Sequence, residues 1–175
     1  MTPMSGRPHT NPDAVEVRTH VPSRTPGHSP VRSRAGSGAT RRVLTLVTAA
    51  GLGVDAYVHW QLAPGFDTLT GAASPHISQG QLFRLEAALS LIAMLLVLLT
   101  RNRLGAAVAF LIAAGGLGAV LLYGYIDVGA FGPLPDMYDP IWYPEKTISA
   151  VAEAVAAVSA LCLLLLPSFA SDADG

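Results

Sequence analysis

Large apolar side chains gather in four blocks of the chain, separated by more polar connections and preceded by a long polar segment. Each block holds about 19–23 residues, and as an α-helix rising about 1.5 Å per residue it crosses a hydrocarbon layer about 30 Å thick. No block contains a proline, and inside lipid the backbone has to bond within its own helix. The pattern therefore predicts an all-α, polytopic membrane protein, a bundle of four transmembrane helices. The predicted helices cover residues 43–62, 82–100, 104–126 and 147–166, within a transmembrane domain at 43–166.

The segment before the first block, residues 1–42, differs in composition from the rest of the chain. It holds six of the thirteen prolines, seven of the ten arginines and few large apolar side chains. Such a segment buries too little apolar surface to offset the entropy of ordering it. We therefore expect a disordered N-terminus, an Arg/Pro-rich tail over 1–42, and a short acidic tail at 167–175.

Basic residues predict which side of the membrane each connection faces. Seven arginines precede the first helix, and Arg101 and Arg103 lie in the short turn between the second and third helices. The two longer connections add only Arg84 and Lys146. Because Lys and Arg concentrate on the cytoplasmic side, we expect a multi-pass protein of the cytoplasmic (inner) membrane with both termini cytoplasmic. The connections at 63–81 and 127–146 then face outward.

Ionisable residues occur inside or at the edge of the apolar blocks, where each costs about 2.5–3.5 kcal/mol at the bilayer centre. The alternating helix directions place all of them in the outer half of the membrane, although they come from three different helices. We interpret them as a candidate polar or ion-binding cluster. Its members are Asp55, His59, Arg84, Glu86 and Glu153, with an outer rim of Tyr123, Asp127, Glu145 and Lys146.

Helical spacing predicts that the acids face the inside of the bundle. Asp55 and His59 are four residues apart and share a helix face, which small and polar residues continue. Glu86 and Glu153 lie on similar stripes of small residues, which membrane helices use where their backbones pack closely. Arg84 lies about 200° around the helix from Glu86. It either extends to the outer headgroups or forms a buried pair with an acid.

Three interpretations of the cluster stay open. One imidazole with two or three carboxylates suits Zn, Mn or Fe, so a metal ion is retained as an option although no cofactor is predicted. Buried carboxylates also exchange protons in transporters. The third interpretation is a structural network of ion pairs and hydrogen bonds that fixes helix packing. A b-type haem is not expected, because only His59 among the five histidines lies within a membrane block.

Composition and motifs narrow the function. With 51% hydrophobic and 13% charged residues, the chain is neither a soluble domain nor a basic nucleic-acid binder, so no nucleic-acid partner is expected. The sequence contains no Gly-x-Ser-x-Gly, P-loop or His-Glu-x-x-His motif, and we predict no catalytic residue. The expected partners are the lipid bilayer, a second copy of the chain, and a membrane or extracytoplasmic protein bound through loops 63–81 and 127–146. We also expect these two loops to pack beside one another.

Three stretches carry a resemblance to a known group of proteins. GVDAYVHWQLAPGFD, ISQGQLFRLEAA and GPLPDMYDPIWYPEKTISA resemble small four-helix integral membrane proteins of actinobacterial type, over residues 43–166. The resemblance implies the architecture and no particular activity. We expect a non-enzymatic membrane subunit or assembly/interaction protein, with a small proton- or cation-coupled transporter or ion-binding membrane protein as the alternative.

Overall fold

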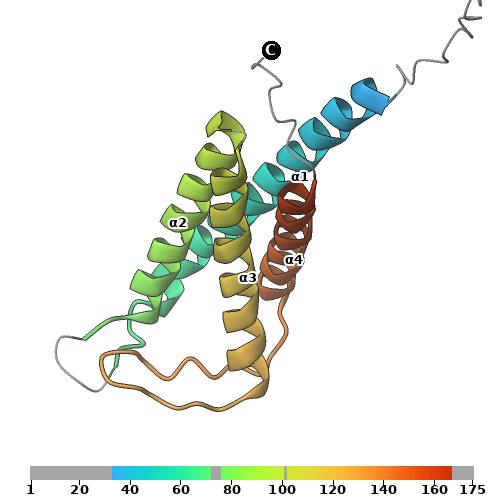
Figure 1. Cartoon of the computed structure of the whole chain (residues 1–175). Helices are drawn as coiled ribbons and strands as arrows, with labels where there is room; N and C mark the ends of the chain where they lie inside the picture. Colours follow the sequence, from blue (N-terminus) through green and yellow to red (C-terminus); the bar gives the residue numbers. More distant parts are fainter. Residues whose placement is uncertain (1–32, 72–75, 101, 167–175) are drawn as a thin grey trace, which may run out of the picture. The chain divides into compact units, whose positions relative to one another are not determined.

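The computed structural model describes residues 33–71, 76–100 and 102–166. Over these residues the chain is all-helical, with four long helices and one short 3-10 helix (Figure 1). The order is α1 (Ser33–Leu62), η1 (Ala63–Phe66), α2 (Gln79–Thr100), α3 (Arg103–Tyr125) and α4 (Pro144–Leu165). Each long helix includes a stretch that is long and apolar enough to cross a membrane. The prediction of four helices is confirmed.

The predicted helix ends agree with the structure to within one residue, but α2 and α4 each begin three residues earlier than predicted, and the start of the first helix differs most. The first helix begins at Ser33, whereas the apolar block and the predicted helix begin at Val43. Residues 33–42 contain no proline, and extending a helix that is already nucleated costs far less than starting one. The predicted disorder at 1–42 is wrong for residues 33–42, which belong to α1. The rest of that segment at 1–32, the acidic tail at 167–175 and the position of Arg101 lie outside the described residues.

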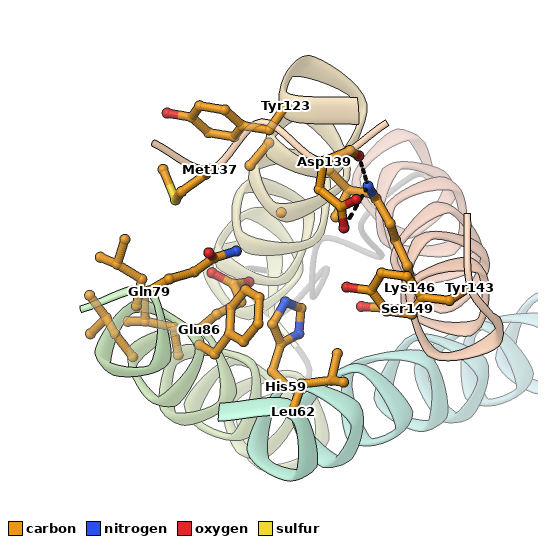
Figure 2. Close-up of a pocket in the computed structure, with 17 residues that line it drawn as sticks. His59, Leu62, Gln79, Glu86, Tyr123, Met137, Asp139, Tyr143, Lys146 and Ser149 are labelled. Carbon is orange, nitrogen blue, oxygen red and sulfur yellow. Dashed lines mark hydrogen bonds and ion pairs between the residues drawn. The ribbon is translucent and has the colours of Figure 1, made fainter. Parts of the chain in front are cut away.

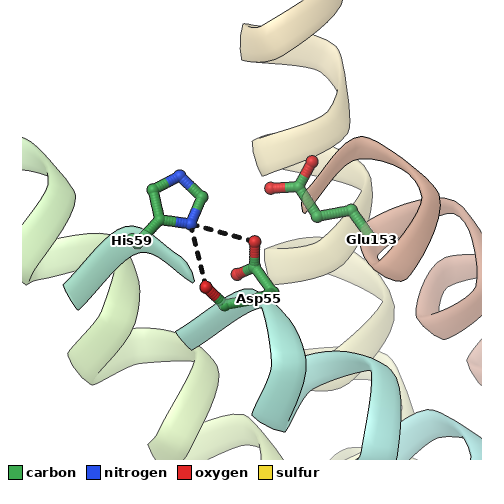
Figure 3. A group of neighbouring side chains, drawn as sticks. All are labelled: Asp55, His59 and Glu153. Carbon is green, nitrogen blue, oxygen red and sulfur yellow. Dashed lines mark hydrogen bonds and ion pairs between the residues drawn. The ribbon is translucent and has the colours of Figure 1, made fainter. Parts of the chain in front are cut away.

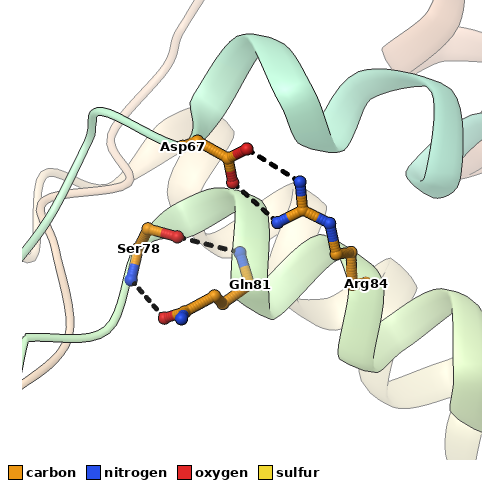
Figure 4. Close-up of polar contacts among 4 residues, drawn as sticks. All are labelled: Asp67, Ser78, Gln81 and Arg84. Carbon is orange, nitrogen blue, oxygen red and sulfur yellow. Dashed lines mark hydrogen bonds and ion pairs between the residues drawn. The ribbon is translucent and has the colours of Figure 1, made fainter.

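Local polar contacts set where the later helices begin. At the start of α2, the Ser78 hydroxyl accepts a hydrogen bond from the Gln81 amide at 3.0 Å, and the Gln81 side chain accepts one from the Ser78 amide at 3.0 Å (Figure 4). This reciprocal capping satisfies two amides that a helix leaves unpaired. Asn102 caps α3 by accepting from the Gly105 amide at 2.8 Å. Pro144 opens α4, where its missing N–H costs nothing.

The bundle packs with small residues inside and large apolar residues outside. α1 and α3 each contact both α2 and α4. Most of the buried apolar residues are alanines, whereas many leucines, valines and isoleucines are exposed on the outer surface. At the closest approach of α1 and α4, a Cβ added to Gly51 would lie 2.7 Å from the carbonyl oxygen of Ala152. Small residues therefore allow the helix backbones to come together.

The stripe of small residues on α3 is buried along only part of its length. Gly105, Ala109 and Ala113 are buried, but Gly115 and Ala119 are exposed. The first three are four residues apart and share one face, whereas Gly115 lies about 200° around the helix from Ala113. Gly115 and Ala119 therefore lie on a different face of α3 from the three buried residues, and this face does not pack in the core.

The connection between α3 and α4 folds across the end of the bundle opposite the α2–α3 turn (Figure 1). The Asp139 amide donates to the Tyr123 carbonyl oxygen at 3.0 Å, which joins this connection to the end of α3. The Ile77 amide donates to the Pro133 carbonyl oxygen at 3.2 Å. This bond confirms that the two long connections pack beside each other, and it positions them over the polar interior.

Candidate functional site

Asp55 is the best-satisfied acid of the site. It lies on α1 with 1% of its surface exposed. Its Oδ1 accepts from the Ser149 hydroxyl at 2.6 Å and its Oδ2 from the Ser90 hydroxyl at 2.8 Å. Its Oδ1 also lies 2.9 Å from Nδ1 of His59 (Figure 3). Groups from α1, α2 and α4 therefore converge on one carboxylate.

The surroundings of His59 indicate which ring nitrogen carries its proton. Nδ1 contacts the backbone carbonyl oxygen of Asp55 at 3.2 Å as well as the carboxylate. Because a carbonyl oxygen only accepts hydrogen bonds, Nδ1 is the donor. In the neutral ring, Nε2 then holds a free lone pair. The edge of Phe83 packs against the ring, with the centroids 5.3 Å apart.

Glu153 is buried without a hydrogen-bond partner. It lies on α4 with 1% of its surface exposed, and within the described residues neither of its carboxylate oxygens is hydrogen-bonded. Figure 3 shows its carboxylate directed towards the Asp55–His59 pair. Oε1 of Glu86, on α2, is also buried and unpaired. Both glutamates approach Gly116 of α3, where an added Cβ would lie 2.3 Å from Oε1 of Glu153 and 3.1 Å from Oε1 of Glu86.

The charges in this cluster do not balance. Asp55, Glu86 and Glu153 bring three carboxylates together with one imidazole. Among the ion pairs of the described residues, the one Lys and the one Arg near the site bond to other acids. Neighbouring carboxylates cannot all stay ionised in a medium of low dielectric constant unless a cation accompanies them. The arrangement is suited to hold a positive charge.

Arg84 does not belong to the cluster and forms no buried pair with Asp55 or Glu153, which corrects its predicted membership. Its guanidinium forms a two-pronged ion pair with Asp67, with both N–O distances 2.7 Å (Figure 4). The side chain is 38% exposed. The hydrogen bonds from Arg84 hold the pKa of Asp67 below its usual value. Asp67 follows η1, and no periodic pattern in the sequence marks it as a partner for Arg84.

A pocket of about 260 Å³ leads to the cluster from the side of the long connections. Leu62, Leu82, Leu85 and Val120 contribute to an apolar wall, while His59, Glu86 and Ser149 lie at its polar part (Figure 2). The pocket therefore connects the rim of the bundle to His59 and Glu86, whereas Asp55 and Glu153 lie behind them and do not line it.

Lys146 is buried beside the mouth of this pocket. Its Nζ donates to the Asp139 carbonyl oxygen and lies 3.6 Å from the Asp139 carboxylate (Figure 2). It also lies 5.4 Å from the centre of the Trp142 ring. Burial, aided by Asp139 and Glu145, raises the pKa of Tyr143, so its hydroxyl stays protonated and able to donate.

Two of the four residues predicted at the rim line the pocket, and the other two do not. Tyr123 and Lys146 line the pocket, but Asp127 and Glu145 are exposed and do not. Oδ1 of Asp127 accepts from the Gly129 amide and closes a local turn instead. Sequence reasoning did not place Ser90 and Ser149 in the site, although their position on the same helix faces as the acids was a usable signal.

Comparison of the chain with protein-family models, with curated proteins and with solved structures finds no match. The geometry of the site itself therefore carries the functional interpretation.

Proposed function

We propose that the chain is a multi-pass protein of the cytoplasmic membrane with both termini cytoplasmic. Four helices of sufficient length and hydropathy support this, as does the apolar outer surface of the bundle. The concentration of arginines in residues 1–42, before the apolar part of α1, supports the orientation. In this orientation the pocket opens on the outer side.

Within that frame, the protein binds a small cation in the cluster of Asp55, His59, Glu86 and Glu153, without catalysing a reaction. The observation that carries this proposal is Glu153, a fully buried carboxylate with no hydrogen-bond partner among the described residues. A carboxyl group at such a position pays a high cost to ionise, so it either stays protonated or is accompanied by a cation. The pocket provides a route for the cation.

The competing interpretation is a purely structural polar network in a membrane subunit or assembly protein. The same α1–α4 interface shows what such a contact looks like. The hydroxyls of Thr48 and Ser159 lie 2.8 Å apart, so that one donates to the other, and the accepting hydroxyl donates to a backbone carbonyl oxygen of its own helix. Every group there has a partner. Glu153 does not, and this difference favours ligand binding for the cluster.

Thermal unfolding of the purified full-length protein in detergent tests the proposal. Sodium, magnesium, calcium, manganese and zinc chlorides are compared at constant ionic strength, which is adjusted with choline chloride. We expect at least one cation to raise the unfolding temperature saturably, and Glu153→Gln to remove this effect. Without added cation, Glu153→Gln should not lower stability, because the substitution breaks no hydrogen bond and the amide cannot ionise.

Glu145→Gln is the matched control, since Glu145 lies on the same helix but is exposed. It should leave the cation response unchanged. A structural network predicts the opposite pattern, in which Glu153→Gln destabilises the protein and no cation stabilises the wild type. That result would refute the cation site.

A partner-binding role is a second candidate, supported by the loop between α3 and α4. Phe131 and Ile141 on this loop are 76% and 68% exposed. Affinity purification from native membranes, with Phe131→Ser and Ile141→Ser as the comparison, tests it. A stoichiometric protein partner that both variants lose would support this role, whereas recovery of the same proteins with all three chains would refute it.

A further inference from the structure

We infer that the cation is a divalent transition-metal ion such as Zn²⁺, Mn²⁺ or Fe²⁺, bound by Asp55, His59 and Glu153. This inference rests on the proposed cation site and names its ligand. Each of the three residues offers one donor atom, and these atoms all lie within 4.8 Å of one another. All three side chains are buried, and they come from two helices that pack directly together.

The distances fit a metal site whose ligands still have to close around the ion. Donors about 2.1 Å from a tetrahedral ion lie about 3.4 Å apart. The required contraction is small, and Glu153 can make it without breaking a hydrogen bond, because neither of its oxygens has one among the described residues. The unpaired carboxylate is thus the ligand that moves freely, whereas His59 and Asp55 have to release the Nδ1 proton between them before both can bind the ion.

The donor set favours a transition metal over calcium, magnesium or an alkali ion. Calcium and magnesium prefer oxygen ligands alone, whereas an imidazole with carboxylates suits zinc, manganese and iron. The hydroxyls of Ser90 and Ser149 hold both oxygens of Asp55 in place, as outer-shell partners of metal ligands do. Glu86, with its unpaired Oε1, is positioned to supply a further oxygen.

Gly116 leaves the space that the site needs. An added Cβ there would lie 2.3 Å from Oε1 of Glu153, well inside contact distance. The neighbour that would have to move is the flexible end of a side chain. We therefore expect Gly116→Ala to fold while displacing Glu153 from the metal position. Gly118, on the same helix, has nothing within 4 Å of an added Cβ and provides the matched control.

The test is a titration of the full chain in detergent with Co²⁺, which is a spectroscopic probe for such sites. The protein is purified with a tag that contains no histidine. Visible absorption reports the ligand field, and competition with Zn²⁺ follows the same signal. We expect one saturable equivalent. Loss of an outer-shell partner weakens metal binding roughly 10- to 100-fold. His59→Ala removes a ligand and Gly116→Ala displaces one, so each should weaken Co²⁺ binding by at least this factor. His76→Ala and Gly118→Ala should leave the affinity unchanged.

His9, His20 and His28 are present in every variant, so any cobalt they hold is a constant background. Absence of a saturable Co²⁺ signal, or a signal that His59→Ala leaves intact, would overturn the metal inference. If sodium or magnesium still stabilises the wild type through Glu153, the cation site stands and only its metal identity falls. If no cation acts at all, both proposals fail together.

Discussion

The close contact between α1 and α4 determines the geometry of the whole cluster, and Gly51→Ala tests it. An added Cβ at Gly51 would lie 2.7 Å from the carbonyl oxygen of Ala152 and 3.0 Å from Cβ of Ala156. These atoms belong to the backbone and to the first side-chain carbon of α4, so they cannot rotate away. The two helices would have to separate to make room.

The magnitude follows from two opposing effects. Forcing an extra methyl into a well-packed interior costs about 1–3 kcal/mol. Alanine is a better helix former than glycine and returns at most about 1 kcal/mol. We therefore expect the free energy of unfolding to fall by up to about 2 kcal/mol, towards the upper end of this range because the obstructing atoms cannot rotate away. Because Asp55 lies one turn beyond Gly51, the same separation should also weaken Co²⁺ binding.

The measurement is unfolding of wild type and variants in mixed detergent micelles, with helix content followed by circular dichroism. Gly53→Ala is the control on the same helix, since its added Cβ would lie 3.4 Å from the flexible Sδ of Met94. This control should be neutral or slightly stabilising. Equal stability of the Gly51→Ala and Gly53→Ala proteins would show that α1 and α4 do not approach as closely as described, and the site geometry would fail with it.

Three further outcomes are expected. Asp55→Asn should lower the free energy of unfolding by about 1–3 kcal/mol, because three donors lose their charged acceptor, and denaturant titration measures this loss. A double-mutant cycle with Thr48→Val and Ser159→Ala should give a coupling energy of about 0.6 kcal/mol, and a value near zero would contradict the interhelical bond. Asp67 has a pKa below its usual value in the folded protein, because it pairs with Arg84. The pair therefore stabilises the fold at any pH above the ordinary carboxyl pKa of about 3.9. This stabilisation is lost as the pH falls through the lowered pKa of the folded protein. The stability difference between wild type and Asp67→Asn, measured against pH, should therefore vanish in acid, and a difference that persists there would exclude the pair as its source.

The sequence by itself determined the helices and the inward direction of the acids. Four apolar blocks without internal prolines have one stable arrangement in a setting where backbone groups must bond locally. Asp55 and Glu153 lie on stripes of small residues, and the helix face that packs closely is also the face that is buried. Helical periodicity is a local property, so these features could be read without knowing which helices are neighbours.

Only the tertiary structure decided which polar groups meet. Arg84 has a long side chain that reaches Asp67, 17 positions earlier in the chain, and helical phase does not describe such a contact. Asp127 and Glu145 are exposed and do not line the pocket. Asp127 closes a turn in the loop, which no helical pattern describes, and Glu145 lies in the first turn of α4. The unpaired state of Glu153 is likewise a property of the assembled bundle, since hydrogen-bond satisfaction depends on every helix that surrounds a group. Periodicity determines which way a side chain points from its own helix, whereas its partners depend on how the other helices are placed around it.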